Sequence, residues 1–241
     1  MITGIVVALP EELSTLTSKK LDKGCVEALA DNILVIYSGA GAENARAASE
    51  LLVAQGANQL ISWGCAAALD KSFRPGDLVL ANSCVDADNI EFDLNNESWL
   101  THIKACLSKR LTVNIYTGKL AESKSIIASS HDKVKIAATT GAIALDMESI
   151  AVAKAAQTHH LPFLTIRAIA DPLAMDLPAA VSHALNDQGD VVLGKLLTYL
   201  LLHPVELPGL VRLGLHFNAA KKTLKQVAKQ LDALTMPLKA H

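Results

Sequence analysis

Three acidic residues of this chain each follow a short apolar segment of the kind that forms a buried strand. They are Glu12 after residues 2–9, Glu148 after 142–145 and Asp171 after 163–169. Because ligands of open α/β sheets bind at the carboxyl ends of strands, we expect these residues at a ligand-binding edge. A carboxylic acid there can donate a proton, and a carboxylate can accept one or stabilise positive charge. The alternative for Glu12 is structural, since Pro10 begins a helix whose dipole an acidic first turn complements.

A glycine pair, Gly39 and Gly41, separates a predicted strand over 32–37 from a predicted helix over 43–55. Glycines let the backbone approach a ligand closely, and the amino end of a helix favours an anion. We therefore predict an anion-binding loop here, with Arg46 in the first turns of the helix as the neutralising cation. The alternatives are that the glycines serve the turn alone and that Arg46 is a solvated surface residue.

Small side chains follow the predicted strand over 58–63. Residues 64–70 are Gly-Cys-Ala-Ala-Ala-Leu-Asp. So many small residues in succession predict a wall against which a flat ligand lies, with Ala66 and Ala67 at its centre. Tight packing of a helix on the sheet is the alternative.

The length of 241 residues suffices for one large α/β domain with a full core. No repeat, low-complexity segment or linker divides the chain. We predict one domain over 1–241 with a central mixed β-sheet surrounded by helices. Its other predicted elements are strands over 78–81 and 113–118, an extended segment over 123–128, helices over 99–109, 131–139 and 150–157, and a long loop over 85–98.

Composition excludes several classes of partner. A net charge of -2 argues against nucleic-acid binding through a basic surface. The apolar amino terminus is too short for a secretory signal and lacks a basic leader. No stretch of about twenty uncharged apolar residues is present, so we expect no transmembrane helix. The four cysteines lack CxxC spacing, which predicts free thiols, no metal site and a cytoplasmic protein.

The carboxyl-terminal extension over 200–241 differs from the rest of the chain. An apolar stretch leads to His203 and Pro204, and a basic amphipathic helix carrying Lys221, Lys222 and Lys225 follows. Such helices can lie on an anionic membrane surface, which would make the protein membrane-associated. The alternatives are that the helix covers the body of the protein or pairs with a second subunit.

With these residues placed, the chain resembles the nucleoside phosphorylase/nucleosidase superfamily along nearly its whole length. Residues 146–148, Asp-Met-Glu, and 167–171, Arg-Ala-Ile-Ala-Asp, resemble the ribose-binding and catalytic segments of methylthioadenosine/S-adenosylhomocysteine nucleosidases. The resemblance implies that Glu148 binds the ribose hydroxyls and that Met147 packs on the apolar side of the sugar. It also implies that Asp171 protonates the leaving purine.

Within the superfamily, the segments 63–70, 74–80, 146–149 and 170–172 are similar to those of the hopanoid-associated phosphorylases. That similarity implies phosphorolysis of a 5′-substituted adenosine such as adenosylhopane, with release of adenine. Inorganic phosphate would be the co-substrate and no other cofactor is expected. The residues expected to hold phosphate are Gly39, Gly41, Arg46 and Cys65, and those expected to line the base pocket are Ala66, Ala67 and Arg167.

A hydrolytic nucleosidase is the alternative, because Glu12 matches the glutamate that activates water in that family. Three departures bear on the choice. Ser62 stands where phosphorylases tend to carry a phosphate-binding arginine, Cys65 replaces a serine, and Ala170 replaces the serine before the catalytic aspartate. A nucleoside-binding member without catalysis is a third possibility. The superfamily also implies a homo-oligomer, most simply a dimer.

Overall fold

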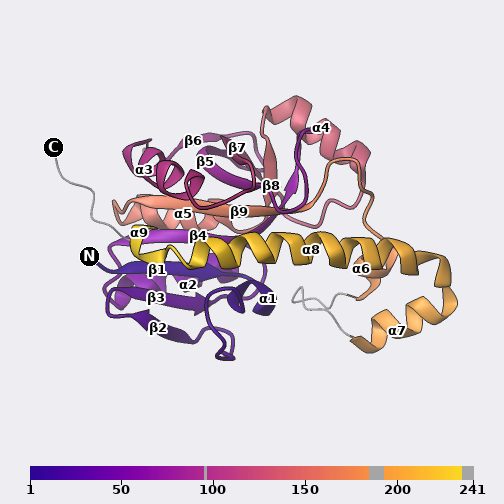
Figure 1. Cartoon of the computed structure of the whole chain (residues 1–241), viewed down its shortest axis with the longest axis horizontal. Coiled ribbons are helices and arrows are strands. Elements are labelled where there is room, and N and C mark those ends of the chain that lie inside the picture. Colours follow the sequence, from indigo (N-terminus) through magenta and orange to yellow (C-terminus); the bar gives the residue numbers. More distant parts are fainter. Residues whose placement is uncertain (95–96, 185–192, 235–241) are drawn as a thin grey trace.

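The computed structural model describes residues 1–94, 97–184 and 193–234, and these form a mixed β-sheet with helices on both faces (Figure 1). The predicted α/β class and mixed sheet are confirmed. Within the described residues the sheet has nine strands. They are β1 Thr3–Val7, β2 Val26–Ala30, β3 Ile33–Tyr37, β4 Gln59–Ala68, β5 Leu78–Val85, β6 Glu91–Asp93, β7 Ile115–Glu122, β8 Ala144–Asp146 and β9 Phe163–Asp171.

The pairing of the strands brings several carboxyl ends to one edge. β1 runs parallel to β3 and β4, and β4 runs parallel to β9. Around β4 the sheet closes on itself, because β9 pairs β5, β5 pairs β7, β7 pairs β8 and β8 returns to β4. The loops after β1 and β3 and the end of β9 therefore lie along the same edge, as the sequence predicted.

The helices cover the two faces of the sheet. Apolar side chains of α3 and α8 join the core on one face, and those of α2 and α5 join it on the other. The helix bounds are α1 Pro10–Leu13, α2 Ala42–Ala54, α3 Glu97–Ser108, α4 Ser130–Thr140, α5 Ser149–Thr158, α6 Ala179–Ala184, α7 Leu193–Leu202, α8 Leu207–Ala228 and α9 Leu231–Leu234, with a short 3-10 helix η1 at Pro204–Glu206.

Several strands are longer than predicted. β4 continues through Gly64 to Ala68, where the sequence predicted its end at Trp63, because β9 and β8 pair with this small-residue segment. β5 and β7 likewise extend to Val85 and Glu122, since each pairs with the other along its length. Pairing with neighbours therefore extends strands past the apolar runs that predict them.

Other predictions need correction. β2 was not predicted, and it forms an antiparallel edge strand on β3. The extended segment expected over 123–128 contains no strand. The loop expected over 85–98 contains β6, which pairs with β5, and the first residues of α3; residues 95–96 lie outside the described part of the chain.

The carboxyl-terminal extension contains the predicted helix as α8, which lies across one face of the sheet (Figure 1). Its inner residues Ala220, Leu224 and Val227 are part of the main core. Before it, α7 and η1 extend away from the sheet (Figure 1). Among the described residues, no single helix is long and apolar enough to cross a membrane. Together, α7 and the η1–α8 segment have sufficient length and apolar composition, but they are bent by 108° relative to each other.

Candidate active site

Glu12 lies in the short helix that follows β1. Leu9 has extended backbone angles and Pro10 begins α1, so the chain turns and brings Glu12 back over the sheet. Its Oε2 accepts a hydrogen bond from the Leu9 N–H at 3.2 Å, and its Oε1 accepts one from the Cys65 N–H at 2.7 Å. The carboxylate therefore caps its own helix and also joins α1 to β4.

Gly64 makes this arrangement possible. A Cβ atom at Gly64 would lie 2.4 Å from Nη1 of Arg167 and 2.6 Å from Oε1 of Glu12. Both side chains therefore occupy the space that any larger residue would need. The glycine lets an acidic and a basic group lie together against the backbone of β4.

Buried polar partners hold the guanidinium of Arg167 next to Gly64. Its Nε lies 2.6 Å from Oδ2 of Asp146, and its Nη2 donates to Ser62 Oγ at 2.6 Å and to Ser149 Oγ at 3.1 Å. Only 1% of the residue is exposed. The expectation that Arg167 lines a base pocket therefore needs correction, because its guanidinium is engaged by Asp146 and by the two serines.

Burial raises the pKa values of Glu12 and Glu148, and the neighbouring charges modify this effect. Burial raises the pKa of Glu12 from 4.5 to about 7, although Arg167 and the Cys65 N–H lower it. Burial and the charge of Asp146 also raise the pKa of Glu148, while Arg167 lowers it. One guanidinium thus lies among three buried carboxyls in the described structure. At neutral pH Glu12 is poised between its acid and base forms.

Glu148 lies at the start of α5 and bonds to the glycine loop. Its Oε1 accepts a hydrogen bond from the Gly41 N–H at 2.9 Å. Met147, beside it, is half-buried, whereas Glu148 itself is buried. The two residues expected at the ribose therefore lie together next to the loop between β3 and α2.

The groups expected to bind phosphate are bonded to carboxylates instead. The Gly41 N–H donates to Glu148, and the Cys65 N–H donates to Glu12. Arg46 projects into solvent and pairs with Glu43 at 3.4 Å. Burial and the neighbouring Glu12 raise the pKa of the Cys65 thiol, so it stays neutral. The Gly41 and Cys65 N–H groups and the Arg46 guanidinium thus have acidic partners in this structure, whereas the sequence predicted that they bind phosphate.

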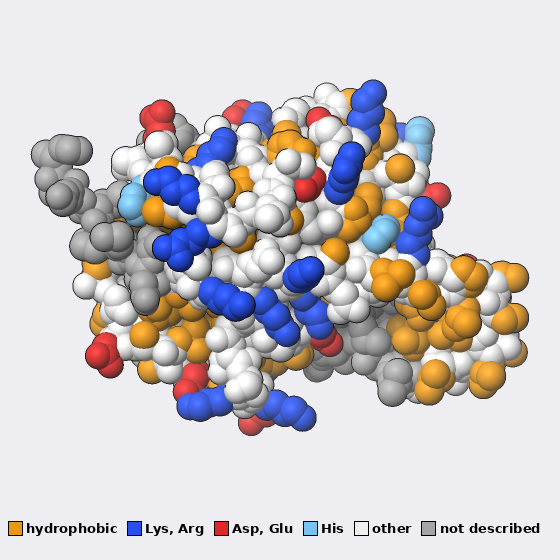
Figure 2. All heavy atoms as spheres, in the orientation of Figure 1, with side chains coloured by type: hydrophobic (Ala, Val, Ile, Leu, Met, Phe, Trp, Pro, Cys, Tyr) orange, Lys and Arg blue, Asp and Glu red, His pale blue; other side chains and the backbone are white. Residues whose placement is uncertain are grey.

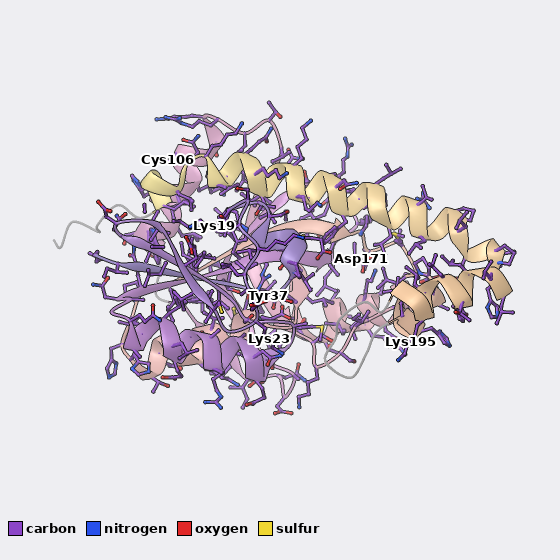
Figure 3. All side chains as sticks on the ribbon, turned by 90° about the horizontal axis from the view of Figure 1, so that it is seen from below. Lys19, Lys23, Tyr37, Cys106, Asp171 and Lys195 are labelled. Carbon is purple, nitrogen blue, oxygen red and sulfur yellow. The ribbon has the colours of Figure 1, made fainter. Side chains whose placement is uncertain are left out.

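Asp171 ends β9 beside the small-residue segment of β4. The register passes from Ala66 opposite Ile169 to Ala67 opposite Asp171, so Ala170 forms a β-bulge. Such bulges redirect the side chains that follow them. Asp171 is 9% exposed, and Figure 3 shows it inside the molecule. Ala67 therefore lies opposite Asp171, and Ala66 lies beside it on β4.

Lys133 of α4 holds the Asp171 carboxyl. Its Nζ lies 2.6 Å from Oδ1 of Asp171 and donates to the carbonyl oxygens of Met175 at 2.8 Å and Pro172 at 3.3 Å. Burial raises the pKa of Asp171, and the Lys133 ammonium partly offsets this. Lys133 was not singled out from the sequence. The available signal was its spacing from Ile136 and Ala137, which lie on the core face of the same helix.

Two further residues of the site were missed as partners. Asp146 and Ser149 flank the predicted Met147 and Glu148, and both bond to Arg167. The sequence shows that both residues adjoin Met147 and Glu148, but it does not show that Arg167 on β9 is their partner. Within the described residues, no group of three His, Cys, Asp or Glu side chains could hold a metal ion.

Comparisons with known proteins agree with this architecture. The 5′-methylthioadenosine/S-adenosylhomocysteine nucleosidase of Staphylococcus haemolyticus is 25% identical over 195 residues, covering 70% of this chain and 85% of that protein. The Neisseria meningitidis nucleosidase of the same name, in complex with methylthio-immucillin-A, superposes with a TM-score of 0.71 at 17% identity, covering 95% of this chain and 98% of the other. Helicobacter pylori futalosine hydrolase superposes with a TM-score of 0.68 at 18% identity, covering 96% of each chain.

The family model for the phosphorylase superfamily matches residues 3–203. This range includes every strand of the sheet and the residues that surround Glu12, Glu148 and Asp171. The chain belongs to the phosphorylase superfamily.

Proposed function

We propose that this protein hydrolyses the N-ribosidic bond of a purine nucleoside. The observation that carries the proposal is Glu12, a buried carboxyl held by two backbone N–H groups at the carboxyl edge of the sheet. A group whose pKa is about 7 is well matched to accept a proton from water near neutral pH. The Staphylococcus haemolyticus relative, named as a nucleosidase, supports the same reaction type.

The leaving purine needs a proton, because it would otherwise depart as an anion. In the proposed reaction Asp171 donates this proton to an imidazole nitrogen of the base. The raised pKa of Asp171 favours the protonated carboxyl that the step requires. Lys133 is a positioning residue, since it fixes one carboxyl oxygen by a hydrogen bond of 2.6 Å. Ala66 and Ala67 provide the flat backbone and small side chains beside the base.

The sugar develops positive charge as the bond to the purine breaks. Glu148 stabilises that charge and accepts hydrogen bonds from the ribose hydroxyls, while Met147 packs against the sugar. Water attacks the anomeric carbon, its proton passes to Glu12, and the bonding electrons leave with the purine. The products are a free base and a free sugar, and no cofactor is consumed.

The proposed substrates are adenosines with a substituent at the 5′ position. The two nucleosidases named above act, by name, on 5′-methylthioadenosine and S-adenosylhomocysteine, and the one from Neisseria meningitidis is in complex with methylthio-immucillin-A. We expect a cytoplasmic protein that forms a homodimer. Light scattering on the purified protein would test the dimer. Adenosylhopane remains one candidate among the 5′-substituted adenosines.

Phosphorolysis is the second candidate, and one observation favours it. The side chain of Lys23 lies across Gly39, with its Cε 2.6 Å from the position of a Cβ on that glycine. Figure 3 shows Lys23, and the residue is exposed, so its ammonium could attract a phosphate to the loop. Hydrolysis is favoured because Gly41 and Cys65 already donate to Glu148 and Glu12.

The deciding experiment measures adenine release from 5′-methylthioadenosine, S-adenosylhomocysteine and adenosine, with and without phosphate, and identifies the sugar product. Equal release without phosphate, giving a free sugar, is expected. Glu12→Gln should lower this rate by about a hundredfold or more, since it removes the base. Glu11→Gln, at the exposed neighbouring position, is the matched control.

Two outcomes would contradict hydrolysis. A sugar 1-phosphate formed only when phosphate is present would establish phosphorolysis, and Lys23→Gln should then raise the KM for phosphate. No adenine from any substrate, together with measurable binding of the nucleoside, would indicate a binding protein instead.

A further inference from the structure

An apolar surface lies at the end of the molecule where α7 meets α8. We call it the apolar tip, and its members are Leu197, Leu201, Leu202, Val205, Val211 and Leu215. Each is more than half exposed, and Leu201 and Val205 reach 83% and 85%. Figure 2 shows these hydrophobic side chains gathered on the part that extends beyond the body of the protein. Single exposed aliphatic residues are ordinary, but a contiguous patch marks a binding surface.

The outer face of α8 changes character along its length. Its inner face is fixed by Ala220, Leu224 and Val227, which are buried in the core. Residues of the outer face recur at steps of three and four, so they form one stripe. In chain order the stripe is Leu207, Val211, Leu215, Asn218, Lys222, Lys225 and Lys229, and all of them are exposed. The face is thus apolar near the tip and basic nearer the body.

The charge around the apolar tip is strongly one-sided. Over residues 193–229 the single acidic residue is Glu206, whereas the cations are Lys195, Arg212, Lys221, Lys222, Lys225 and Lys229. The whole chain carries a slight negative charge of -2, so this excess is local to the extension. Figure 2 shows Lys and Arg side chains over the body of the protein, whereas the protruding part that carries the apolar tip is mainly hydrophobic.

We propose that the apolar tip docks on the surface of an anionic lipid bilayer. Exposed Leu and Val side chains would enter the headgroup and outer acyl region, and the lysines of α8 would bind lipid phosphates. This pairing of apolar insertion with basic contacts is what interfacial helices require. A second copy of the chain fits less well, because a two-fold contact through the tip would bring two basic stripes together.

The dimensions suit shallow insertion. The 22 residues of α8 extend over about 33 Å, and Leu215 and Lys222 are separated by about 10 Å along the axis. Interfacial helices bury their apolar faces roughly 5–10 Å deep, so Lys222 would remain near the level of the phosphates when Leu215 is inserted. Lys225 and Lys229 would lie further out, where they still attract the anionic surface. The bend of 108° between α7 and the η1–α8 segment exposes Leu201 and Val205 at the corner, where they would enter first.

The test is sedimentation of the full chain with vesicles of phosphatidylcholine alone and with added phosphatidylglycerol. Wild type should sediment with the anionic vesicles, and added salt should weaken the binding. Leu201→Glu with Val205→Glu should weaken it by roughly a hundredfold, because two inserted aliphatic side chains become carboxylates. Lys222→Gln with Lys225→Gln should weaken it by roughly tenfold or more on anionic vesicles only.

A matched control places the same charges elsewhere. Leu51→Glu with Ile90→Glu alters two exposed aliphatic residues outside the extension and should leave vesicle binding unchanged. Nucleoside cleavage in solution should be unchanged in all three double variants, so failure of this inference is separable from failure of the proposed function. Three results would overturn the inference: no sedimentation of wild type, equal binding to neutral and anionic vesicles, or a tip variant whose only change is dissociation of a dimer.

Discussion

Nζ of Lys133 lies 2.6 Å from Oδ1 of Asp171, and the lysine side chain is completely buried. Two opposing influences therefore act on the same carboxyl. Burial raises the pKa of Asp171 and is the larger influence, while the ammonium lowers it. The net result is a carboxyl that protonates more readily than an exposed aspartate yet keeps a fixed orientation.

Lys133→Met should move the pH dependence of cleavage to higher pH. Without the ammonium, the pKa of Asp171 rises further, so the protonated acid persists to higher pH and the alkaline limb of kcat shifts upward. Activity at neutral pH should fall about tenfold or more, because the carboxyl loses the partner that orients it. The measurement is the pH profile of kcat for wild type and variant.

The control for this prediction is Lys135→Met on the same helix. Lys135 is exposed and pairs with Asp132 at 3.4 Å on the surface, so its loss should change neither the profile nor kcat. An alkaline limb that stays in place in Lys133→Met would mean that Asp171 is not the group whose protonation the reaction needs.

Gly64→Ala should damage the site directly. The new Cβ would meet Nη1 of Arg167 at 2.4 Å and Oε1 of Glu12 at 2.6 Å, so both side chains must move. We expect a loss of about 1–3 kcal/mol in the free energy of unfolding, and cleavage reduced together with it. Urea denaturation and kcat/KM measure the two effects.

Gly214→Ala provides the comparison, because nothing lies within 4 Å of the added Cβ and the residue is inside α8. This variant should be more stable than wild type by about 0.5–1 kcal/mol, since alanine favours the helix. Equal effects of the two substitutions would show that Glu12 and Arg167 can move without cost.

The sequence allowed the three carboxyls to be located because each follows an apolar run that forms a strand. The rule that parallel strands share an edge places Glu12 and Asp171 together, since β1, β4 and β9 are parallel. It does not place Glu148, because β8 pairs with β4 in the antiparallel sense. The partners of these carboxyls come from distant segments, and no local pattern indicates them. Lys133 reaches Asp171 from 38 residues away, and Cys65 donates to Glu12 from 53 residues away.

Distant partners also explain why two of the predicted phosphate donors bond to carboxylates in this structure. Gly41 and Cys65 offer backbone donors, and the sequence shows no reason why an anion should not use them. Only the fold reveals that Glu148 and Glu12 supply the anionic oxygens themselves. The edge strand β2 was missed because Glu27, Ala28 and Ala30 are poor strand formers. Its pairing with β3 stabilises the extended conformation.

Asp146→Asn should destabilise the protein by about 3–5 kcal/mol under acidic conditions, because Arg167 loses its ion-pair partner inside the protein. The loss should be smaller above pH 7. There Glu12 is ionised, and the pKa of Glu148 is lower in the variant because the charge of Asp146 no longer raises it. Both carboxylates can then balance the guanidinium.

Urea denaturation below pH 4.5 and above pH 7 checks the expected difference. Asp132→Asn is the control, since that aspartate pairs on the surface with Lys135 and should have little effect at either pH. A destabilisation that is the same at both pH values would argue against compensation by Glu12 and Glu148.

Glu12→Gln should separate stability from activity. Folding raises the pKa of Glu12 from 4.5 to about 7, so the folded protein favours the protonated carboxyl. The corresponding stabilisation, about 3 kcal/mol, is complete below pH 4.5 and is lost as the pH rises towards 7. Glutamine stays neutral, so the variant should gain stability relative to wild type as the pH rises, while cleavage falls by about a hundredfold or more.

Thermal unfolding of wild type, Glu12→Gln and Glu11→Gln across this pH range measures stability. Adenine release by the same three proteins measures activity. Glu11 is exposed, so its substitution should change neither. A purely structural glutamate would give a variant whose stability and activity fall together. Above pH 7 the ionised Glu12 is buried, and this burial opposes folding. A variant that is more stable there and nearly inactive would therefore show that the carboxylate serves the reaction and not the fold.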